Sequence, residues 1–543
     1  MEFLWAYVGS SELVIFFGVI FIVLLCHSLL VPLFYWHKRG VPYITAIPLF
    51  GNMANSVLQR VFIGEIYMQM YNQLEGKRYG GFLKFCKPGV IVRDPKLIKS
   101  VLEMAFPSFH DNDLAVNEDL EDLLNQNLFA LTGERWKQLR KDLLPLFSPD
   151  KMKAIHPLVE DVCYNLCLYL NGITGSELEL NDLCARFTIE VISSCAFGIK
   201  SDAIHIPNSE FRQMALEMLD PSPCQAVVTM TLIQFPWIFH CLPQSYLPEK
   251  VSNFFHYCVH QVVTLREREG NKRSDLMSVL IQLKKEGKLG IKSKKHCRLV
   301  SGVNKENLTT KGSTYAWGPE SIDDVAAQAF GFIFGGLETC TTVISFALFE
   351  LAHYPEIQKK LRKKINEVKF KHGGKLSYEA LEEIHYLEMV ILETLRKYPP
   401  VSFLARLTTK PFKFPIPEEK SSESIEEKLV TLEVGIPVVI PVLGLHRDPK
   451  YYPDPEIFDP KRFSKEVSSQ RDPFTFLPFG EGPRVCVGRR FGLMLSKAAI
   501  ATIVLSFELM PSGNTLLPIT FDPTQFHTSS KNKLHVYIRK LKS

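Results

Sequence analysis

The segment PFGEGPRVCVG places a cysteine in surroundings that suit a thiolate ligand. Phe479, Gly482, Arg484, Cys486 and Gly488 follow the spacing FxxGxRxCxG, so five positions match rather than a lone cysteine. A thiolate must be kept near positive partial charge and away from water, because it otherwise protonates or oxidises. Glycine lets backbone N–H groups approach the sulfur closely. The pattern predicts that Cys486 binds iron; the alternative is a structural cysteine in a glycine-rich turn.

A second segment, GGLETCTT at 335–342, combines an acid and an alcohol inside an apolar run that begins near Ser321. The preceding SIDD predicts a helix N-terminus, with Asp324 three residues after the serine. Two adjacent glycines inside a helix cost about 1 kcal/mol each relative to alanine, so they indicate a functional constraint. Glu338 and Thr339 are suited to proton transfer. The alternative is a core helix with an incidental glutamate.

Two further pairs have helical spacing. Glu393 and Arg396 in ETLRKYPP share one helix face and are able to form an ion pair. Trp136 and Arg140 in GERWKQLRKDLLPLF are four residues apart on one face of another predicted helix. Each pair alone is weak evidence of function. The residues after Gly488, RRFGLMLSKAAIATIVLSF, predict a helix whose N-terminal dipole favours an anion just before it.

These segments, in this order, resemble the motifs of the cytochrome P450 family over nearly the whole chain, and RFGLML and FDPTQFH are similar to its insect detoxification members. The resemblance implies haem b with the Cys486 thiolate as axial ligand of the iron. It also implies that Glu338 and Thr339 deliver protons to dioxygen. Arg462 in FDPKRF would complete a structural Glu–Arg–Arg network. Lys461 and Cys340 differ from the usual family residues, but these differences leave the roles of the residues above unchanged.

The resemblance also assigns residues to haem binding and to substrate binding. The predicted haem-binding residues, besides Cys486, are Trp136, Arg140, Arg406, Phe479, Arg484 and Gly488; the arginines would hold the propionates. Substrate would contact residues 109–129 and 205–250, and also Ser402 and Phe403. Phe-rich stretches such as LIQFPWIF favour an apolar ligand.

The predicted fold class is mainly α with a small β-rich region, the single helical domain of the P450 fold preceded by one N-terminal transmembrane helix. Apolar residues recur at helical spacing through most of the first half, and strand patterns occur at FLKFC with VIVR, at 429–442 and near the C-terminus. The predicted organisation is a membrane anchor at 1–36, a proline hinge at 37–52 and the haem-thiolate domain at 53–543. A basic stretch at 284–318 predicts an exposed insertion.

The run from Leu13 to Trp36 carries no formal charge and is long enough to cross a hydrocarbon layer of about 30 Å. Tyr35 and Trp36 would lie in the interfacial aromatic belt, and Lys38 and Arg39 follow. The basic side faces the cytosol, which predicts a single-pass protein of the endoplasmic reticulum membrane. A cleaved signal is disfavoured by the acidic N-terminus and the length of the run.

Composition excludes several other classes of protein. The 543 residues carry a formal net charge of +5 without basic runs interleaved with aromatics, so no nucleic-acid partner is expected. The 12 cysteines include no CxxC pair, which argues against a zinc site or a disulfide framework. A reducing, cytosol-facing environment fits this usage.

The sequence thus predicts a monooxygenase that inserts one oxygen atom from dioxygen into a lipophilic small molecule. No Gly-rich dinucleotide fingerprint is present, so electrons would come from an NADPH-dependent flavoprotein reductase, with cytochrome b5 as a second candidate donor and membrane lipid as a further partner. The basic residues expected to face the reductase are Arg135, Lys137, Lys141, Arg489 and Arg490. A haem-thiolate isomerase or dehydratase and a non-catalytic haem or ligand-binding protein are the alternatives.

Overall fold

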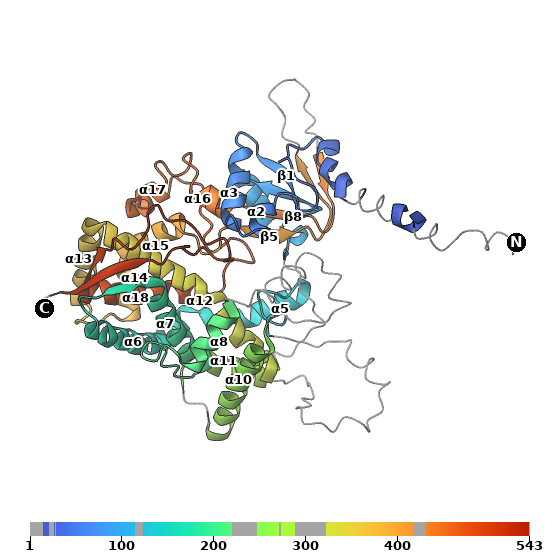
Figure 1. Ribbon diagram of the computed structural model, residues 1–543. Helices are drawn as coiled ribbons and strands as arrows, with labels where there is room; N and C mark the ends of the chain where they lie inside the picture. Colours follow the sequence, from blue (N-terminus) through green and yellow to red (C-terminus); the bar gives the residue numbers. More distant parts are fainter. Residues whose placement is uncertain are drawn as a thin grey trace, which may run out of the picture. The chain divides into compact units, whose positions relative to one another are not determined.

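The computed structural model describes residues 15–20, 27, 29–113, 123–219, 247–270, 273–287, 322–415 and 429–541. The chain forms two compact units, and each is assembled from separate stretches of sequence (Figure 1). The first unit comprises Met1–Asp113, Glu393–Cys486 and Leu517–Asn532. The second unit comprises Leu114–Leu392, Val487–Leu516 and Lys533–Ser543.

The first unit is built on a five-stranded sheet with the order β1-β2-β8-β5-β3. The strands are β1 (Tyr79–Lys84), β2 (Lys87–Val92), β8 (Pro437–Ile440), β5 (Leu404–Leu407) and β3 (Asp111–Asn112). β1 and β2 form a hairpin whose turn contains Phe85 in the left-handed region. β2 pairs with β8 in parallel, and the remaining pairs are antiparallel. The strands predicted around 82–93 and 429–442 are thus confirmed.

Apolar runs explain why this sheet lies in the core of the first unit. Every side chain of β8 is buried, as expected for a strand covered on both faces. Val90 and Val438 pack in one hydrophobic cluster with Tyr71, while Ile91 and Val439 belong to a second cluster. The remaining regular elements of this unit are α2 (Ala54–Val57), α3 (Ile63–Gln73), α4 (Pro95–Lys99), α16 (Val442–His446), α17 (Lys465–Ser468), β6 (Phe412–Pro415) and β7 (Leu429–Leu432).

The second unit is mainly helical and is organised around α12 (Ile322–His353). This helix is apolar along most of its length and packs against α7, α10 and α18 (Figure 1). Its helices are α5 (Gly133–Leu143), α6 (Pro149–Gly172), α7 (Leu180–Ile192), α8 (Glu210–Leu219), α10 (Glu249–Glu269), α11 (Leu276–Lys285), α13 (Pro355–Lys371), α14 (Tyr378–Glu383) and α18 (Arg489–Ser506). A small sheet has the order β4-β10-β9, with β4 (Glu177–Glu179), β10 (His535–Lys540) and β9 (Phe507–Pro511).

One helix, α15 (His385–Lys397), contains the boundary between the two units. Its last residues, from Glu393, belong to the first unit. The mainly helical fold with small sheets agrees with the predicted fold class.

The predicted membrane anchor lies largely outside the described residues. Of its described part, residues 15–20 are helical and, apart from Gly18, exposed, and Val31–Phe34 form a 3-10 helix. Within the described part of the chain, one helix is apolar and long enough to span a membrane, namely α12. Since 67% of its most apolar stretch is buried, α12 has the character of a core helix.

The prediction that Trp36 lies in an interfacial belt was wrong. Its side chain is only 2% exposed, and its indole N–H donates to the carbonyl of Phe82 at 3.0 Å. Gly81 makes room for the ring, since a Cβ there would lie 2.3 Å from a Trp36 ring atom. The hydrophobic pattern placed Trp36 with the preceding apolar run, whereas a partner 46 residues away in sequence determines its burial.

The structure describes part of the predicted proline hinge and the start of the predicted insertion. Residues of the predicted proline hinge bond to β1, since Gly81 N–H donates to Pro42 and Ile44 N–H donates to Gly81. The predicted insertion begins too early, because α11 continues to Lys285 and Lys284 forms an ion pair with Glu267 at 3.3 Å. Residues 288–318 of that insertion lie outside the described residues.

Candidate active site

The cysteine loop of the first unit, residues 477–486, is closed by backbone hydrogen bonds. The N–H of Cys486 donates to the carbonyl of Phe479 at 2.9 Å, and Val485 N–H donates to Gly482 at 3.0 Å. Gly480 and Gly482 have φ values of 69° and 77°, a region that favours glycine. The loop therefore holds the Cys486 thiol at an exposed position at its end.

The two glycines predicted to flank the thiol have different roles in the structure. A Cβ on Gly482 would lie 2.0 Å from the carbonyl oxygen of Leu102, so close packing as well as its φ value requires glycine there. Gly488 has φ −83° and is the N-cap of α18, where a Cβ would make an ordinary contact with Phe147. The predicted helix start just after Cys486 is confirmed.

Arg484 and Arg406 are brought together by consecutive residues of β3. Arg484 donates from Nη2 to Oδ1 of Asp111 at 3.3 Å and from Nε to the carbonyl of His110. Arg406 lies on β5, opposite Asn112, and donates to the Oδ1 atom of Asn112 at 2.9 Å. Both predicted propionate-binding arginines of the first unit thus converge on β3.

Arg406 is a buried cation without an acidic partner among the described residues. Arg406 is 5% exposed and also donates to the carbonyl of Ala405 at 3.1 Å. Its Nε has no hydrogen-bond partner in the part of the chain that the structure describes. Burial lowers the pKa of the guanidinium to about 10. A buried cation normally requires a nearby anion. Arg406 is therefore suited to bind an anionic group of a ligand.

The predicted network of Glu393, Arg396 and Arg462 is confirmed. Glu393 and Arg396 are fully buried on α15 and form a bidentate pair with two N–O distances of 2.8 Å. Nε of Arg462 lies 3.4 Å from Oε1 of Glu393, and the backbone N–H of Asp459 donates to the same oxygen at 3.0 Å. Because both Glu393 oxygens are bonded to Arg396 and the guanidinium of Arg462 lies beside them, the charges of this cluster compensate one another, and we interpret it as a support of the fold.

In the second unit, the middle of α12 is open whereas the stretches on either side of it are buried. Gly335 is exposed, and Glu338 and Thr339 are half-buried on the same part of the helix. Thr339 donates its hydroxyl hydrogen to the carbonyl of Gly335 at 2.7 Å. Burial raises the pKa of the Glu338 carboxyl, which favours retention of a proton toward neutral pH. Both side chains are thus able to hold or relay a proton at this open face.

Trp136 and Arg140 share one face of α5, as predicted. Trp136 is 5% exposed, and the guanidinium carbon of Arg140 lies 5.8 Å from the centroid of its ring. The carbonyl of Phe147, shortly after α5, accepts a hydrogen bond from Arg490 of α18 at 3.3 Å. The C-terminal end of this region therefore lies against the start of α18 within the second unit.

Two residues of the regions predicted to bind substrate are buried in the core of the first unit. Phe109 is fully buried and packs edge to face with Phe412 at 5.0 Å. Ser402 is 1% exposed and packs against Gly64. By contrast, Phe129 of the second unit is 48% exposed and lies 6.1 Å from Phe334 of α12, ring to ring. Residues 114–122 and 220–246 of the predicted substrate regions lie outside the described residues.

Sequence reasoning missed His446. This residue ends α16 and is fully buried, and its Nε2 accepts the backbone N–H of Leu477 at 2.9 Å. The signal was available, because His446 follows the apolar run VVIPVLGL, which predicts burial of its last residue.

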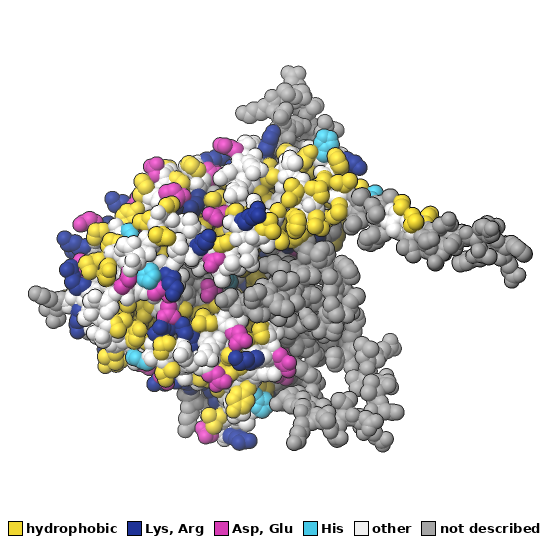
Figure 2. Space-filling model, viewed as in Figure 1, with side chains coloured by type: hydrophobic (Ala, Val, Ile, Leu, Met, Phe, Trp, Pro, Cys, Tyr) yellow, Lys and Arg dark blue, Asp and Glu magenta, His cyan; other side chains and the backbone are white. Residues whose placement is uncertain are grey.

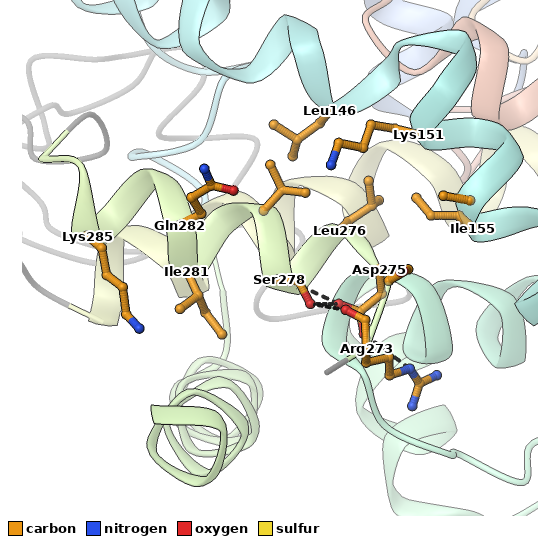
Figure 3. Close-up of a pocket in the computed structure, with 13 residues that line it drawn as sticks. Leu146, Lys151, Ile155, Arg273, Asp275, Leu276, Ser278, Ile281, Gln282 and Lys285 are labelled. Carbon is orange, nitrogen blue, oxygen red and sulfur yellow. Dashed lines mark hydrogen bonds and ion pairs between the residues drawn. The ribbon is translucent and has the colours of Figure 1, made fainter. Parts of the chain in front are cut away.

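A cleft of about 340 Å³ lies between α6 and α11 in the second unit (Figure 3). Lys151 and Ile155 line it from α6, and Leu276, Ile281 and Gln282 line it from α11. None of the predicted site residues is among those that line it. The cleft is thus separate from the candidate active-site residues described above.

Comparisons with known proteins agree with this geometry. The family model described as Cytochrome P450 matches residues 41–536. The chain is similar to Cytochrome P450 9e2 of Blattella germanica, with 34% identity over 91% of each chain, and to Cytochrome P450 6k1 of the same organism, with 35% identity over 89% of each. It is also similar to Cytochrome P450 6a2 of Drosophila melanogaster, with 33% identity over 97% of this chain and all of that protein.

The fold and these matches define a haem-thiolate monooxygenase, and the chain belongs to the cytochrome P450 family. The family uses haem b with a cysteine thiolate as axial ligand, together with dioxygen, an organic substrate and a redox partner. The residues of the first unit fit this cofactor, because the thiol of Cys486 is accessible to an iron and Arg406 is a buried cation that has no acidic partner among the described residues and could bind a propionate.

Proposed function

We propose that Cys486 is the axial ligand and that the chain oxidises a lipophilic small molecule. The observation that carries the assignment is the cysteine loop, which its backbone hydrogen bonds and left-handed glycines hold in a defined shape with an exposed thiol at its end. When bound, a thiolate-ligated haem activates dioxygen. The other residues proposed to contact the cofactor near Cys486 are Phe479 in the loop and Gly488 at the start of α18.

The proposed propionate partners are Trp136, Arg140, Arg406 and Arg484. Support is strongest for Arg406, because its buried guanidinium lacks an internal anion among the described residues. Arg484 is almost fully buried but already shares Asp111, which makes it a weaker donor to a ligand. Trp136 and Arg140 lie together on α5, consistent with a joint role.

We assign proton delivery to Glu338 and Thr339. The carboxyl pKa of Glu338 is raised by burial, which brings it toward the range in which a carboxyl group exchanges protons at neutral pH. The Thr339 oxygen is an acceptor as well as a donor, and its own hydrogen is directed to Gly335. Glu338 can therefore hold a proton beside Thr339, whose hydroxyl would relay it by accepting one hydrogen while its own turns from Gly335 toward the ligand.

The apolar character of the substrate is supported by phenylalanines beside the open face of α12. Phe334 contacts Phe129 and stacks with Phe330, with centroids 6.3 Å apart. Aromatic side chains provide large apolar area for a ligand. Aromatic side chains at this part of α12 favour a lipophilic molecule over a charged one.

For the redox partner, we propose an NADPH-dependent flavoprotein reductase, with cytochrome b5 as a second donor. Lys137, Lys141, Arg489 and Arg490 are exposed residues of the second unit, at α5 and the start of α18. Exposed cations steer an acidic protein surface and fix its orientation. Arg135 contributes less, because it is half-buried and donates to Gln126 at 2.8 Å.

For location, we propose the cytosolic face of the endoplasmic reticulum membrane, with single-pass anchorage. The residues at 15–20 expose large apolar side chains, and Tyr43, Ile47, Leu49, Val57 and Leu58 form a second exposed apolar group. Figure 2 shows hydrophobic side chains gathered on the face that carries α2 in Figure 1. Contiguous exposed apolar side chains of this kind favour contact with lipid.

The assignment of Cys486 is tested by the spectrum of the full-length protein with haem. The reduced protein with carbon monoxide should show the red-shifted Soret band of a thiolate-ligated haem. Cys486→Ala should abolish that band, whereas Cys258→Ala, at a half-buried cysteine of α10, should retain it. Persistence of the band in Cys486→Ala would show that another residue binds the iron.

A further inference from the structure

Residues 475–477, which form the stem of the cysteine loop, precede the thiol in sequence. Three contacts hold this stem in place. The hydroxyl of Tyr452 donates to the carbonyl of Thr475 at 3.2 Å. The ring of Phe476 stacks on that of His446, with centroids 5.1 Å apart and an interplanar angle of 29°. The N–H of Leu477 donates to Nε2 of His446 at 2.9 Å. Two of the three contacts involve one imidazole.

His446 also joins this stem to the buried ion pair. Nη1 of Arg396 donates to the backbone carbonyl of His446 at 3.1 Å, and Arg396 is itself held by both oxygens of Glu393. The backbone of His446 is thus fixed by the ion pair, while its side chain fixes the loop stem. All of these contacts lie within the first unit.

The imidazole must be neutral to accept the Leu477 N–H, so its proton is on Nδ1. Burial lowers the pKa of His446 to about 3, and the charges of Arg396 and Arg471 add to this effect. The imidazole therefore stays neutral, and Nε2 stays an acceptor, at neutral and mildly acidic pH. Without it, a backbone N–H in a buried setting would have no partner, which is costly.

We propose that His446 is a positioning residue for the cysteine loop, coupling the Glu393–Arg396 pair to the thiolate through its bond with Leu477. This inference rests on the proposed role of Cys486 as axial ligand. It predicts that loss of the acceptor at Nε2 loosens the loop and lets the thiolate ligation fail sooner. A side chain that restores an acceptor at this position should restore the ligation.

The test compares two replacements in the haem-loaded full chain. His446→Leu removes the acceptor, and His446→Gln places an amide oxygen where Nε2 lies. In the reduced carbon monoxide form, the red-shifted Soret band should convert to the unshifted band roughly tenfold faster in His446→Leu, and within about twofold of the wild-type rate in His446→Gln. Equal rates for the two variants would overturn the proposal.

A matched control separates positioning from general stability. Thr408→Val removes a fully buried hydrogen bond to the carbonyl of Ile436 in the same unit, away from the loop stem. It should lower the unfolding temperature comparably to His446→Leu yet leave the conversion rate of the band close to that of the wild type. If Thr408→Val accelerates the conversion as much, His446 contributes stability alone and the proposal is wrong.

Hydrogen exchange in the wild-type protein provides a measurement that does not depend on folding of the variants. The amide of Leu477 should be strongly protected, and rapid exchange there would contradict the proposal. A wild-type protein that lacks the red-shifted band altogether would instead refute the ligation by Cys486. The two failures are thus distinguishable.

Discussion

Arg396 and Arg406 are both buried in the first unit, yet their surroundings are opposite. Arg396 is fully buried and meets a carboxylate through two short contacts, with further bonds to the carbonyls of His446 and Ile457. Arg406 is 5% exposed and meets one amide oxygen and one carbonyl, with no acid beside it among the described residues. The same side chain thus serves as an internal support in one place and as a candidate ligand-binding group in the other.

The difference lies in where the compensating anion comes from. Burial of a charge is costly unless an opposite charge or strong hydrogen bonds compensate it. For Arg396 the chain supplies that charge itself, whereas for Arg406 a bound anion would supply it. Loss of the ion pair at Arg396 should therefore mainly lower the free energy of unfolding. Loss of Arg406 should mainly weaken the retention of haem.

The largest effect is expected for Glu393→Gln, which leaves the Arg396 cation buried without its partner. Removing one member of such a pair costs about 3 to 5 kcal/mol. The free energy of unfolding should fall by that amount in denaturant titrations. Glu356→Gln makes the same chemical change at an exposed position of α13 and should have little effect. A small loss in Glu393→Gln would mean that the pair contributes little to the fold.

An intermediate effect is expected for Arg406→Met, and mainly on haem retention. Loss of a charge-assisted hydrogen bond of about 1.5 to 3 kcal/mol should raise the rate of haem release tenfold or more. The unfolding free energy of the haem-free chain should stay the same or rise, because a costly buried cation is removed. Haem transfer to a scavenger protein and denaturant titration measure the two quantities. If Arg406→Met lowered the free energy of unfolding as strongly as Glu393→Gln does, Arg406 would be a residue that stabilises the fold rather than one that binds a ligand.

The smallest effect concerns Glu338, an acid whose pKa is raised by burial alone. The native state binds its proton more tightly than the unfolded state, so wild-type stability is lost as pH rises through the native pKa. Glu338→Gln should match the wild type at acidic pH and become more stable toward neutral pH, by less than about 1 kcal/mol because solvent screens a half-buried group. Unfolding temperatures measured across this pH range test the sign. A variant less stable than the wild type toward neutral pH would show that the native pKa of Glu338 is lowered instead.

Local patterns were sufficient for the features that depend on neighbours in sequence. The spacing of Glu393 with Arg396 and of Trp136 with Arg140 predicted shared helix faces that the structure contains. The helix after Cys486 and the paired strands around Phe85 also follow from short-range patterns.

Features that depend on distant partners could not be predicted in this way. Burial of Trp36 arises from Phe82 and Gly81, and Ser402 is enclosed by Gly64. The partner of Arg406 is Asn112, which lies 294 residues away in sequence. An apolar pattern predicts that a residue is buried, but it does not specify the residue against which it packs. For the same reason the sequence predicted Arg406 as a ligand-binding group without showing that no acid among the described residues compensates its charge.

The parallel pairing of β2 with β8 has a consequence for synthesis of the chain on the ribosome. The β1–β2 hairpin emerges first, and its apolar edge at Val90 and Ile91 has no partner until Val438 and Val439 are made. At about 5 to 20 residues per second, that edge waits for tens of seconds. An unpaired apolar strand edge invites association with other chains. We therefore expect the nascent protein to need shielding during this interval. Its yield should depend on the supply of chaperones more than the yield of a protein whose neighbouring strands are consecutive in sequence.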